Sequence, residues 1–259
     1  MSSRSSPSLA RITGAELEVQ GLNEAAQSPT VVFLHEGLGS VSMWRDFPAR
    51  LCDEANCRGL VYSRRGYGES SPINGPRSVR FMHEEAFEVL PEVLKHFGVD
   101  EPFLFGHSDG ASIAILYAGA RLGPLRGLVL EAPHVFVEPK CIAAIAATQK
   151  TYETTKLGER LAKYHGANTD AAFRTWTDVW LRPEFLDWNI EEYLKPITVP
   201  ALVIQGKDDE YGTLAQVERV SRQLGGPVET LVLPNCGHSP HRDQPDAVLD
   251  RAARFMRAG

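Results

Sequence analysis

The chain has 259 residues, which is enough for one sizeable hydrophobic core and for a single α/β domain. Hydrophobic residues make up 43% and charged residues 23%, so the composition is that of a globular protein and excludes the disordered and fibrous classes. The formal net charge of −6 and the lack of basic runs argue against a nucleic-acid partner, because binding to phosphates draws on clustered Lys and Arg.

The first residues, from Met1 to Arg11, are rich in serine and lack the apolar segment of a secretory signal, so we expect a short, loosely ordered tail. No later stretch has the length of a membrane span, which predicts no membrane partner. Cys52, Cys57, Cys141 and Cys236 show neither a CxxC spacing nor the pattern of a disulfide framework. We therefore expect reduced thiols and a cytoplasmic protein.

Short apolar runs alternate with longer amphipathic segments, which is typical of a parallel sheet flanked by helices. The runs are continuous, and this continuity fits strands that are buried on both faces. The predicted strands are Thr30–Leu34, Gly59–Tyr62, Pro102–Phe105, Leu125–Leu130, Ala201–Ile204 and Val228–Leu233.

Three segments between the strands have the spacing of helices. From Phe81 to Phe97, apolar residues recur every three or four positions and form one stripe. Pro91 is expected to kink or restart this helix, because proline lacks the N–H of a helical hydrogen bond. Ser108–Leu122 and Asp246–Met256 are the other predicted helices.

The interval from about His134 to Pro196 breaks this rhythm, because it has helical patterns but no convincing strand. We interpret residues 134–196 as a helical cap inserted into a core formed by residues 1–133 and 197–259. The aromatic residues of the cap either hold its helices together or line an apolar substrate pocket, and they are Tyr152, Tyr164, Trp176, Trp180, Phe185, Trp188 and Tyr193.

The strongest local signal is the sequence GHSDG at residues 106–110, directly after a predicted strand and at the start of a predicted helix. A sharp strand-to-helix turn strains its central residue, and glycines on both sides relieve the crowding. This context predicts that Ser108 is a nucleophile, whereas an ordinary glycine-containing turn is the structural alternative. A carboxylate nucleophile is disfavoured, because Asp109 comes one position after the centre of the turn.

A serine nucleophile needs a histidine to accept its proton and a carboxylate to hold that histidine. His238 follows the last predicted strand within the sequence NCGHSP and is the favoured base, while His241 is the alternative. Three consecutive carboxylates, Asp208, Asp209 and Glu210, follow the preceding strand. We favour Asp209 as the acid, with Asp208 as the alternative, and the structural alternative for Asp208 and Glu210 is a solvated acidic loop.

Acyl transfer also needs hydrogen-bond donors for the developing negative oxygen. The loop HEGLG at residues 35–39 follows the first predicted strand, and the N–H of Gly37 is the favoured donor, with Glu36 and Leu38 as alternatives. The second expected donor is the N–H of Asp109. A simple strand-ending turn is the structural alternative for this loop.

Together, the HEGLG loop, the RRGYGES segment, the GHSDG turn, the GKDD loop and the CGH loop resemble the α/β-hydrolase superfamily in their order along the chain. The likeness extends from about Glu16 onward and is greatest to capped esterases, proline iminopeptidases and carbon–carbon bond hydrolases. It implies an α/β-hydrolase fold, in which a mostly parallel sheet carries a helical cap inserted after the sixth strand. It implies no metal and no organic cofactor. HEGLG is similar to the HGGPG loop of proline iminopeptidases, but Glu36 and Leu38 replace a glycine and the proline.

These observations predict a serine hydrolase that cleaves a carboxylic ester, or a similar acyl bond, of a small apolar molecule through an acyl-enzyme on Ser108. Thioesters and amides are included in that class. One alternative is cleavage of a carbon–carbon bond in a diketone-like acid, which the resemblance to meta-cleavage product hydrolases permits. Another is a noncatalytic small-molecule receptor on the same fold. No oligomeric state is predicted.

Overall fold

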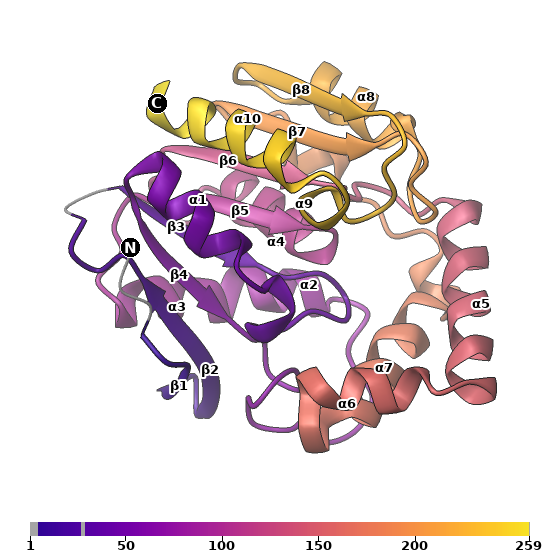
Figure 1. Ribbon diagram of the computed structural model, residues 1–259. Coiled ribbons are helices and arrows are strands. Elements are labelled where there is room, and N and C mark those ends of the chain that lie inside the picture. The colour runs from indigo at the N-terminus through magenta and orange to yellow at the C-terminus, as the bar shows by residue number, and fades with distance from the viewer. Residues whose placement is uncertain (1–4, 27–28, 259) are drawn as a thin grey trace.

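The computed structural model describes residues 5–26 and 29–258, and an eight-stranded sheet forms its centre (Figure 1). The strand order is β1-β2-β4-β3-β5-β6-β7-β8, with β3 to β8 parallel and β1 and β2 antiparallel to their neighbours. The strands are β1 (Ser8–Ile12), β2 (Ala15–Leu22), β3 (Thr30–Leu34), β4 (Arg58–Tyr62), β5 (Phe103–His107), β6 (Gly127–Glu131), β7 (Ala201–Gly206) and β8 (Val228–Leu233). The predicted mostly parallel α/β fold is therefore confirmed.

The expectation of a loose N-terminal tail is wrong for the residues from Ser8 onward. Strand β1 pairs with β2 through a tight turn at Thr13 and Gly14, both of which have positive φ. Most of β1 is exposed at the edge of the sheet, so it lacks the continuous apolar run by which the inner strands were predicted. Residues 1–4 of the expected tail lie outside the described residues.

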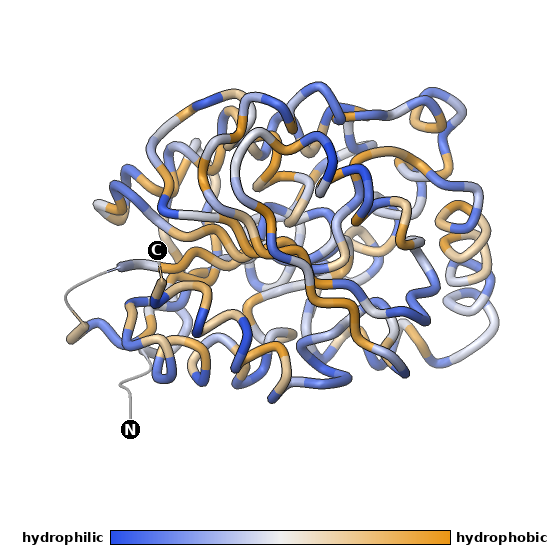
Figure 2. Tube along the Cα trace, turned by 90° about the horizontal axis from the view of Figure 1, so that it is seen from above, coloured by the Kyte–Doolittle hydropathy of each residue, from blue (hydrophilic) through white to orange (hydrophobic). Residues whose placement is uncertain are grey.

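Helices cover both faces of the sheet (Figure 1). Helices α1 (Phe47–Ala55) and α10 (Pro245–Ala258) pack on one face, and α3 (Leu90–His96), α4 (Asp109–Gly119) and α8 (Leu214–Gln223) pack on the other. Figure 2 shows the hydrophobic strands crossing the middle of the molecule between these more mixed layers. Strands β5, β6 and β7 are buried along their whole length, which gives the site a rigid base.

The helix predicted from Phe81 to Phe97 is divided into three parts. Helix α2 (Phe81–Glu84) passes into a π-helical turn (Glu85–Val89), and α3 begins at Leu90. Pro91 lies in the first turn of α3, where a missing N–H costs no helical hydrogen bond. The predicted restart at this proline is therefore present, and the wider turn precedes it.

The chain between β6 and β7 forms three α-helices, α5 (Pro139–Thr154), α6 (Leu157–His165) and α7 (Thr169–Trp180), together with short 3₁₀ turns. They lie beyond the carboxyl ends of the parallel strands (Figure 1), where open α/β sheets bind their ligands. The helical insertion after the sixth strand is thus present, and the exact limits of 134 and 196 stay a prediction. An isolated bridge joins Phe136 to Asn189 within this segment.

None of the helices in the described ranges is long and apolar enough to cross a membrane.

The final helix is longer than predicted, because α10 begins at Pro245, and the short helix α9 (Pro240–Asp243) comes before it. All four cysteines are buried free thiols, as the sequence led us to expect.

Candidate active site

Ser108 lies at the sharp turn between β5 and α4. Its φ of 53° and ψ of −117° belong to a region that residues other than glycine rarely adopt. A Cβ atom on Gly106 would collide with the backbone of Gly110, and a Cβ on Gly110 would collide with the carbonyl group of Leu34. Because backbone atoms cannot yield to such contacts, this turn requires both glycines of the GHSDG sequence.

The structure brings Ser108, His238 and Asp209 together at the carboxyl end of the sheet. His238 Nε2 lies 2.9 Å from Ser108 Oγ, and His238 Nδ1 lies 2.9 Å and 2.8 Å from the two carboxylate oxygens of Asp209. A carboxylate only accepts hydrogen bonds, so Nδ1 carries the proton of the neutral ring and Nε2 presents a lone pair. The Ser108 hydroxyl therefore donates to Nε2, which is the arrangement needed for transfer of its proton.

Asp209 is held as an anion by the groups around it. Its Oδ1 accepts hydrogen bonds from the N–H groups of Tyr211 at 2.7 Å and Gly212 at 3.1 Å, and its Oδ2 accepts one from Gln205 Nε2 at 2.6 Å. Burial alone would raise the pKa of Asp209, but His238 and the backbone N–H groups hold this pKa below its ordinary value. The carboxylate is therefore charged at neutral pH and fixes the tautomer of the histidine.

Asp209 and His238 were predicted together with alternative candidates, and the structure gives those candidates other surroundings. Asp208 is exposed, and Glu210 accepts a hydrogen bond from the backbone N–H of His238 at 3.2 Å. His241 is buried, and its Nδ1 donates to Glu131 Oε2 at 2.8 Å. His241 thus braces the loop from inside and does not lie on the surface.

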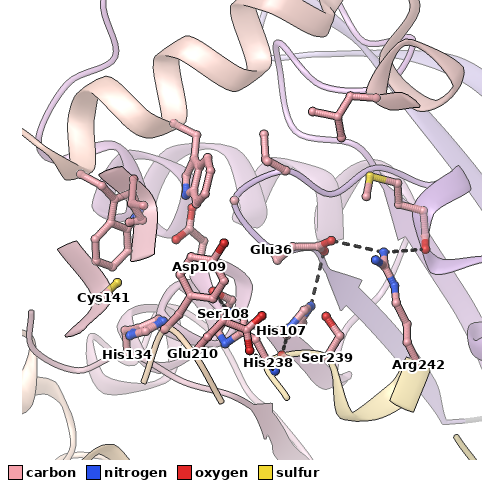
Figure 3. Close-up of a pocket in the computed structure, with 18 residues that line it drawn as sticks. Glu36, His107, Ser108, Asp109, His134, Cys141, Glu210, His238, Ser239 and Arg242 are labelled. Atoms are coloured by element: carbon pink, nitrogen blue, oxygen red, sulfur yellow. Dashed lines mark hydrogen bonds and ion pairs between the residues drawn. The ribbon is translucent and has the colours of Figure 1, made fainter. Parts of the chain in front are cut away.

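A pocket of about 190 Å³ opens beside the Ser108 hydroxyl, beneath the helices between β6 and β7 (Figure 3). An engineered apolar cavity of roughly 150 Å³ holds benzene, so this volume suits a single ring or a short acyl chain. Apolar side chains form much of its wall, and they include Leu38, Met43, Ile145, Leu161, Trp176 and Trp180.

Two of the seven predicted cap aromatics, Trp176 and Trp180, line this pocket. Other members of the set pack in the cap: the ring of Tyr152 stacks on Phe173 at 3.8 Å, and Phe185 stacks on Trp188 at 5.5 Å. Both roles that the sequence left open for these residues are therefore present. Periodicity alone did not separate them, because aromatic residues that pack in the cap and those that line the pocket are equally apolar.

The HEGLG loop lies between a buried guanidinium and the cap. Arg64 Nη2 donates to the carbonyl oxygen of Glu36 at 2.8 Å, and the same side chain lies 3.7 Å from the carboxylate of Asp109. Gly37 and Asp109 both line the pocket, and none of the hydrogen bonds of the described loops and turns uses either N–H. Both groups are therefore available as donors to a ligand.

Gly37 also lies directly against the cap, because a Cβ atom there would collide with the indole of Trp176. We expect Gly37→Ala to lower kcat/KM for an ester by about 10- to 100-fold, since a displacement of 1 Å in a site costs about that much. In a Trp176→Ala background, the same substitution is expected to cost less than about 3-fold, because the obstructing ring is gone. Initial rates of the four proteins of this double-mutant cycle test the prediction.

Gly158→Ala serves as the control for that cycle. Gly158 lies in α6 of the cap, and a Cβ there would be at ordinary contact distance from Tyr152. This variant is expected to keep the parent rate. Equal losses from Gly37→Ala with and without the Trp176 indole would contradict the proposed contact.

The buried charged groups behind the nucleophile were not predicted from the sequence. His107, Glu131 and His241 form a group of possible metal ligands within 4.8 Å of one another. We assign no metal to them, because Nδ1 of His241 already donates to Glu131 and Nε2 of His107 bonds to the backbone of His238. The glutamate at the end of the buried strand LVLE was the available signal, since a carboxylate is rarely buried without a partner.

The comparison with known families decides the classification. A model described as the alpha/beta hydrolase family matches residues 31–251. The chain belongs to this family. The resemblance predicted from its sequence motifs is therefore confirmed. The GHSDG turn, the GKDD loop and the CGH loop follow one another in the order that the superfamily uses.

Several known proteins are similar to this chain over most of its length. A 2-succinyl-6-hydroxy-2,4-cyclohexadiene-1-carboxylate synthase of Enterobacter sp. (strain 638) is 25% identical over 260 residues, which cover 88% of this chain and 92% of that protein. The proline iminopeptidase of Saccharolobus solfataricus is 25% identical over 289 residues, which cover 95% and 90%. A thermophilic esterase from Thermogutta terrifontis has a TM-score of 0.74 at 20% identity, over 98% of this chain and 99% of that one.

Proposed function

We propose that this protein is a serine hydrolase that cleaves a carboxylic ester, or a similar acyl bond, of a small apolar molecule. The observation that supports it most directly is the continuous chain of hydrogen bonds from Asp209 through His238 to Ser108, whose hydroxyl faces the pocket. Each bond of this chain has the length of an ordinary hydrogen bond, so the proton can pass from the serine to the histidine without rearrangement.

In the proposed reaction, Ser108 Oγ attacks the carbonyl carbon of the substrate while His238 Nε2 takes the hydroxyl proton. The backbone N–H groups of Gly37 and Asp109 stabilise the negative oxygen. The intermediate then collapses, the ester bond breaks, and the departing alcohol takes the proton from Nε2. A water molecule then loses a proton to the same nitrogen and attacks the acyl carbon. The bond between that carbon and Ser108 Oγ breaks, the acid leaves, and Oγ takes the proton back from Nε2.

The charges of the pocket favour an uncharged ester over a diketone-like acid. Among the arginine and lysine residues of the described chain, Arg242 alone lines the pocket. Glu36 lies 3.4 Å from its guanidinium. Glu210 adds another carboxylate to the wall. A substrate carboxylate would therefore find no unpaired arginine or lysine among these lining residues, which disfavours carbon–carbon cleavage of such an acid. The names of the relatives alone do not select the bond, since they include a synthase and a peptidase.

We expect the parent protein to hydrolyse para-nitrophenyl acetate and butyrate, with kcat/KM at least about 10-fold lower for octanoate, because the pocket holds only a short chain. Leu161→Ala removes apolar volume from the wall and is expected to raise the octanoate-to-butyrate ratio of kcat/KM by about 5-fold or more. Initial rates across the ester series test both statements.

A fluorophosphonate provides an independent test of the serine. Mass spectrometry of the treated protein is expected to find the adduct on Ser108 and on no other residue. A protein that neither hydrolyses any ester of the series nor takes the label would contradict the proposed function and favour a noncatalytic receptor.

A further inference from the structure

His107 precedes the nucleophile and is among the residues that line the pocket, and its side chain lies between Glu36 and the backbone of His238 (Figure 3). It is completely buried, and its Nε2 lies 2.7 Å from the carbonyl oxygen of His238. A carbonyl oxygen only accepts a hydrogen bond, so Nε2 must carry a proton. On the opposite side of the ring, Nδ1 lies 3.5 Å from Glu36 Oε2.

These two contacts determine the charge of the ring. If the ring were neutral with its proton on Nε2, the lone pair of Nδ1 would face the carboxylate of Glu36 in a buried setting, which is repulsive. A second proton on Nδ1 converts this contact into an attraction between opposite charges. The imidazolium is therefore the form that satisfies both neighbours.

Charged and titratable groups face the ring from several elements, and among them the ring of His238 lies 5.2 Å away. The carboxylate of Glu131 approaches from β6, where it accepts hydrogen bonds from His241. The ring of His241 lies 5.0 Å from that of His107, and Arg242 on the same short helix lies 3.4 Å from Glu36. Burial alone would lower the pKa of His107, but Glu36 and Glu131 raise it to about 8.

We propose that His107 is a cationic positioning residue, which ties the loop that carries Gly37 to the loop that carries His238. Its contact with Glu36 holds one proposed oxyanion donor, and its contact with the His238 carbonyl holds the backbone of the base. Arg242 binds the second oxygen of Glu36 and completes this link. The inference rests on the proposed function, because it assigns a role in that reaction.

The charge of the ring has a test that does not depend on activity. In the full-length protein labelled with ¹⁵N-histidine, long-range ¹H–¹⁵N spectra distinguish imidazolium from the neutral tautomers, and the spectrum of His107→Gln assigns the resonance. We expect both ring nitrogens of His107 to be protonated at pH 7 and one proton to be lost near pH 8. A neutral ring at pH 7 would overturn the proposal, whatever the protein hydrolyses.

The kinetic consequence follows from the loss of that proton. Between pH 7 and 9.5, kcat/KM of the parent for para-nitrophenyl butyrate, followed by pH-stat titration, is expected to fall about 10-fold with an apparent pKa near 8. His107→Gln retains a side-chain donor for the His238 carbonyl but has no charge, so its lower activity is expected to be nearly constant over this range. Glu36→Gln removes the anion that raises the pKa of His107, so the fall is expected to move to lower pH.

A role in packing alone predicts a different result, since it would lower the activity of His107→Gln by the same factor at every pH. His96→Gln is the matched control: His96 is exposed at the end of α3, and its variant is expected to keep the parent profile. Persistence of the alkaline fall in folded His107→Gln would overturn the proposal, and if that variant does not fold, an unmoved profile in Glu36→Gln would do so. If the parent hydrolyses no ester, the proposed function fails, while the spectra still decide the charge of His107.

Discussion

Replacing Ser108 with alanine is expected to lower kcat/KM for para-nitrophenyl butyrate by about 10⁵-fold, which is of the order found for the nucleophile of a serine hydrolase. The substitution removes the oxygen that would attack the carbonyl carbon, and the water that replaces it lacks the fixed position 2.9 Å from His238 Nε2. The fold should not suffer, because alanine lacks one atom only and the strained turn is held by the flanking glycines.

A double mutant shows whether serine and histidine act as one unit. His238→Ala is expected to cause a loss similar to that of Ser108→Ala, and the two changes together should cost little more than either alone. Ser221→Ala, on the exposed surface of α8, is the control and should keep the parent rate. A Ser108→Ala protein that retained more than about one hundredth of the activity would contradict the serine mechanism.

The parts of the site that lie at the ends of buried strands could be predicted from the sequence. Ser108 and Asp209 follow β5 and β7, which are buried along their whole length, whereas β8 before His238 is mostly exposed at the edge of the sheet, so its expected burial on both faces is wrong. Parallel strands bring the ends of all three to the same edge of the sheet. The order of these segments along the chain and the glycines of the GHSDG turn then restricted the candidates for nucleophile, acid and base to a few residues. Asp208 and His241 remained as alternatives because only the tertiary structure shows which side chain faces the serine.

Other features depend on contacts between distant segments, and no local pattern reports them. The approach of Trp176 to Gly37 joins the cap to the first catalytic loop. The protonation state of His107 depends on Glu36 and Glu131, which follow or end two different strands. Strand β1 was not predicted for a local reason. It lies exposed at the edge of the sheet, so its sequence has no apolar run.

Asp209→Asn is expected to lower kcat by about 10⁴-fold with little change in the fold, which is the loss measured for the corresponding change in a well-studied triad. An asparagine oxygen in the place of Oδ1 can keep the hydrogen bonds from Tyr211 and Gly212, so that the NH₂ group takes the place of Oδ2 and faces His238 Nδ1. This NH₂ group favours the tautomer that carries its proton on Nε2. Such a ring has no lone pair for the Ser108 hydroxyl and cannot accept its proton.

The neighbouring carboxylate offers a control that differs by one position. Asp208→Asn removes the same charge from the same loop, but Asp208 is exposed, so its variant is expected to stay within about 2-fold of the parent. Thermal unfolding of both variants separates a loss of catalysis from a loss of structure. A large loss in Asp208→Asn together with an active Asp209→Asn would show that Asp208, and not Asp209, is the acid. The expected contrast shows that a carboxylate orients the histidine through direct contact and not through the charge of the loop.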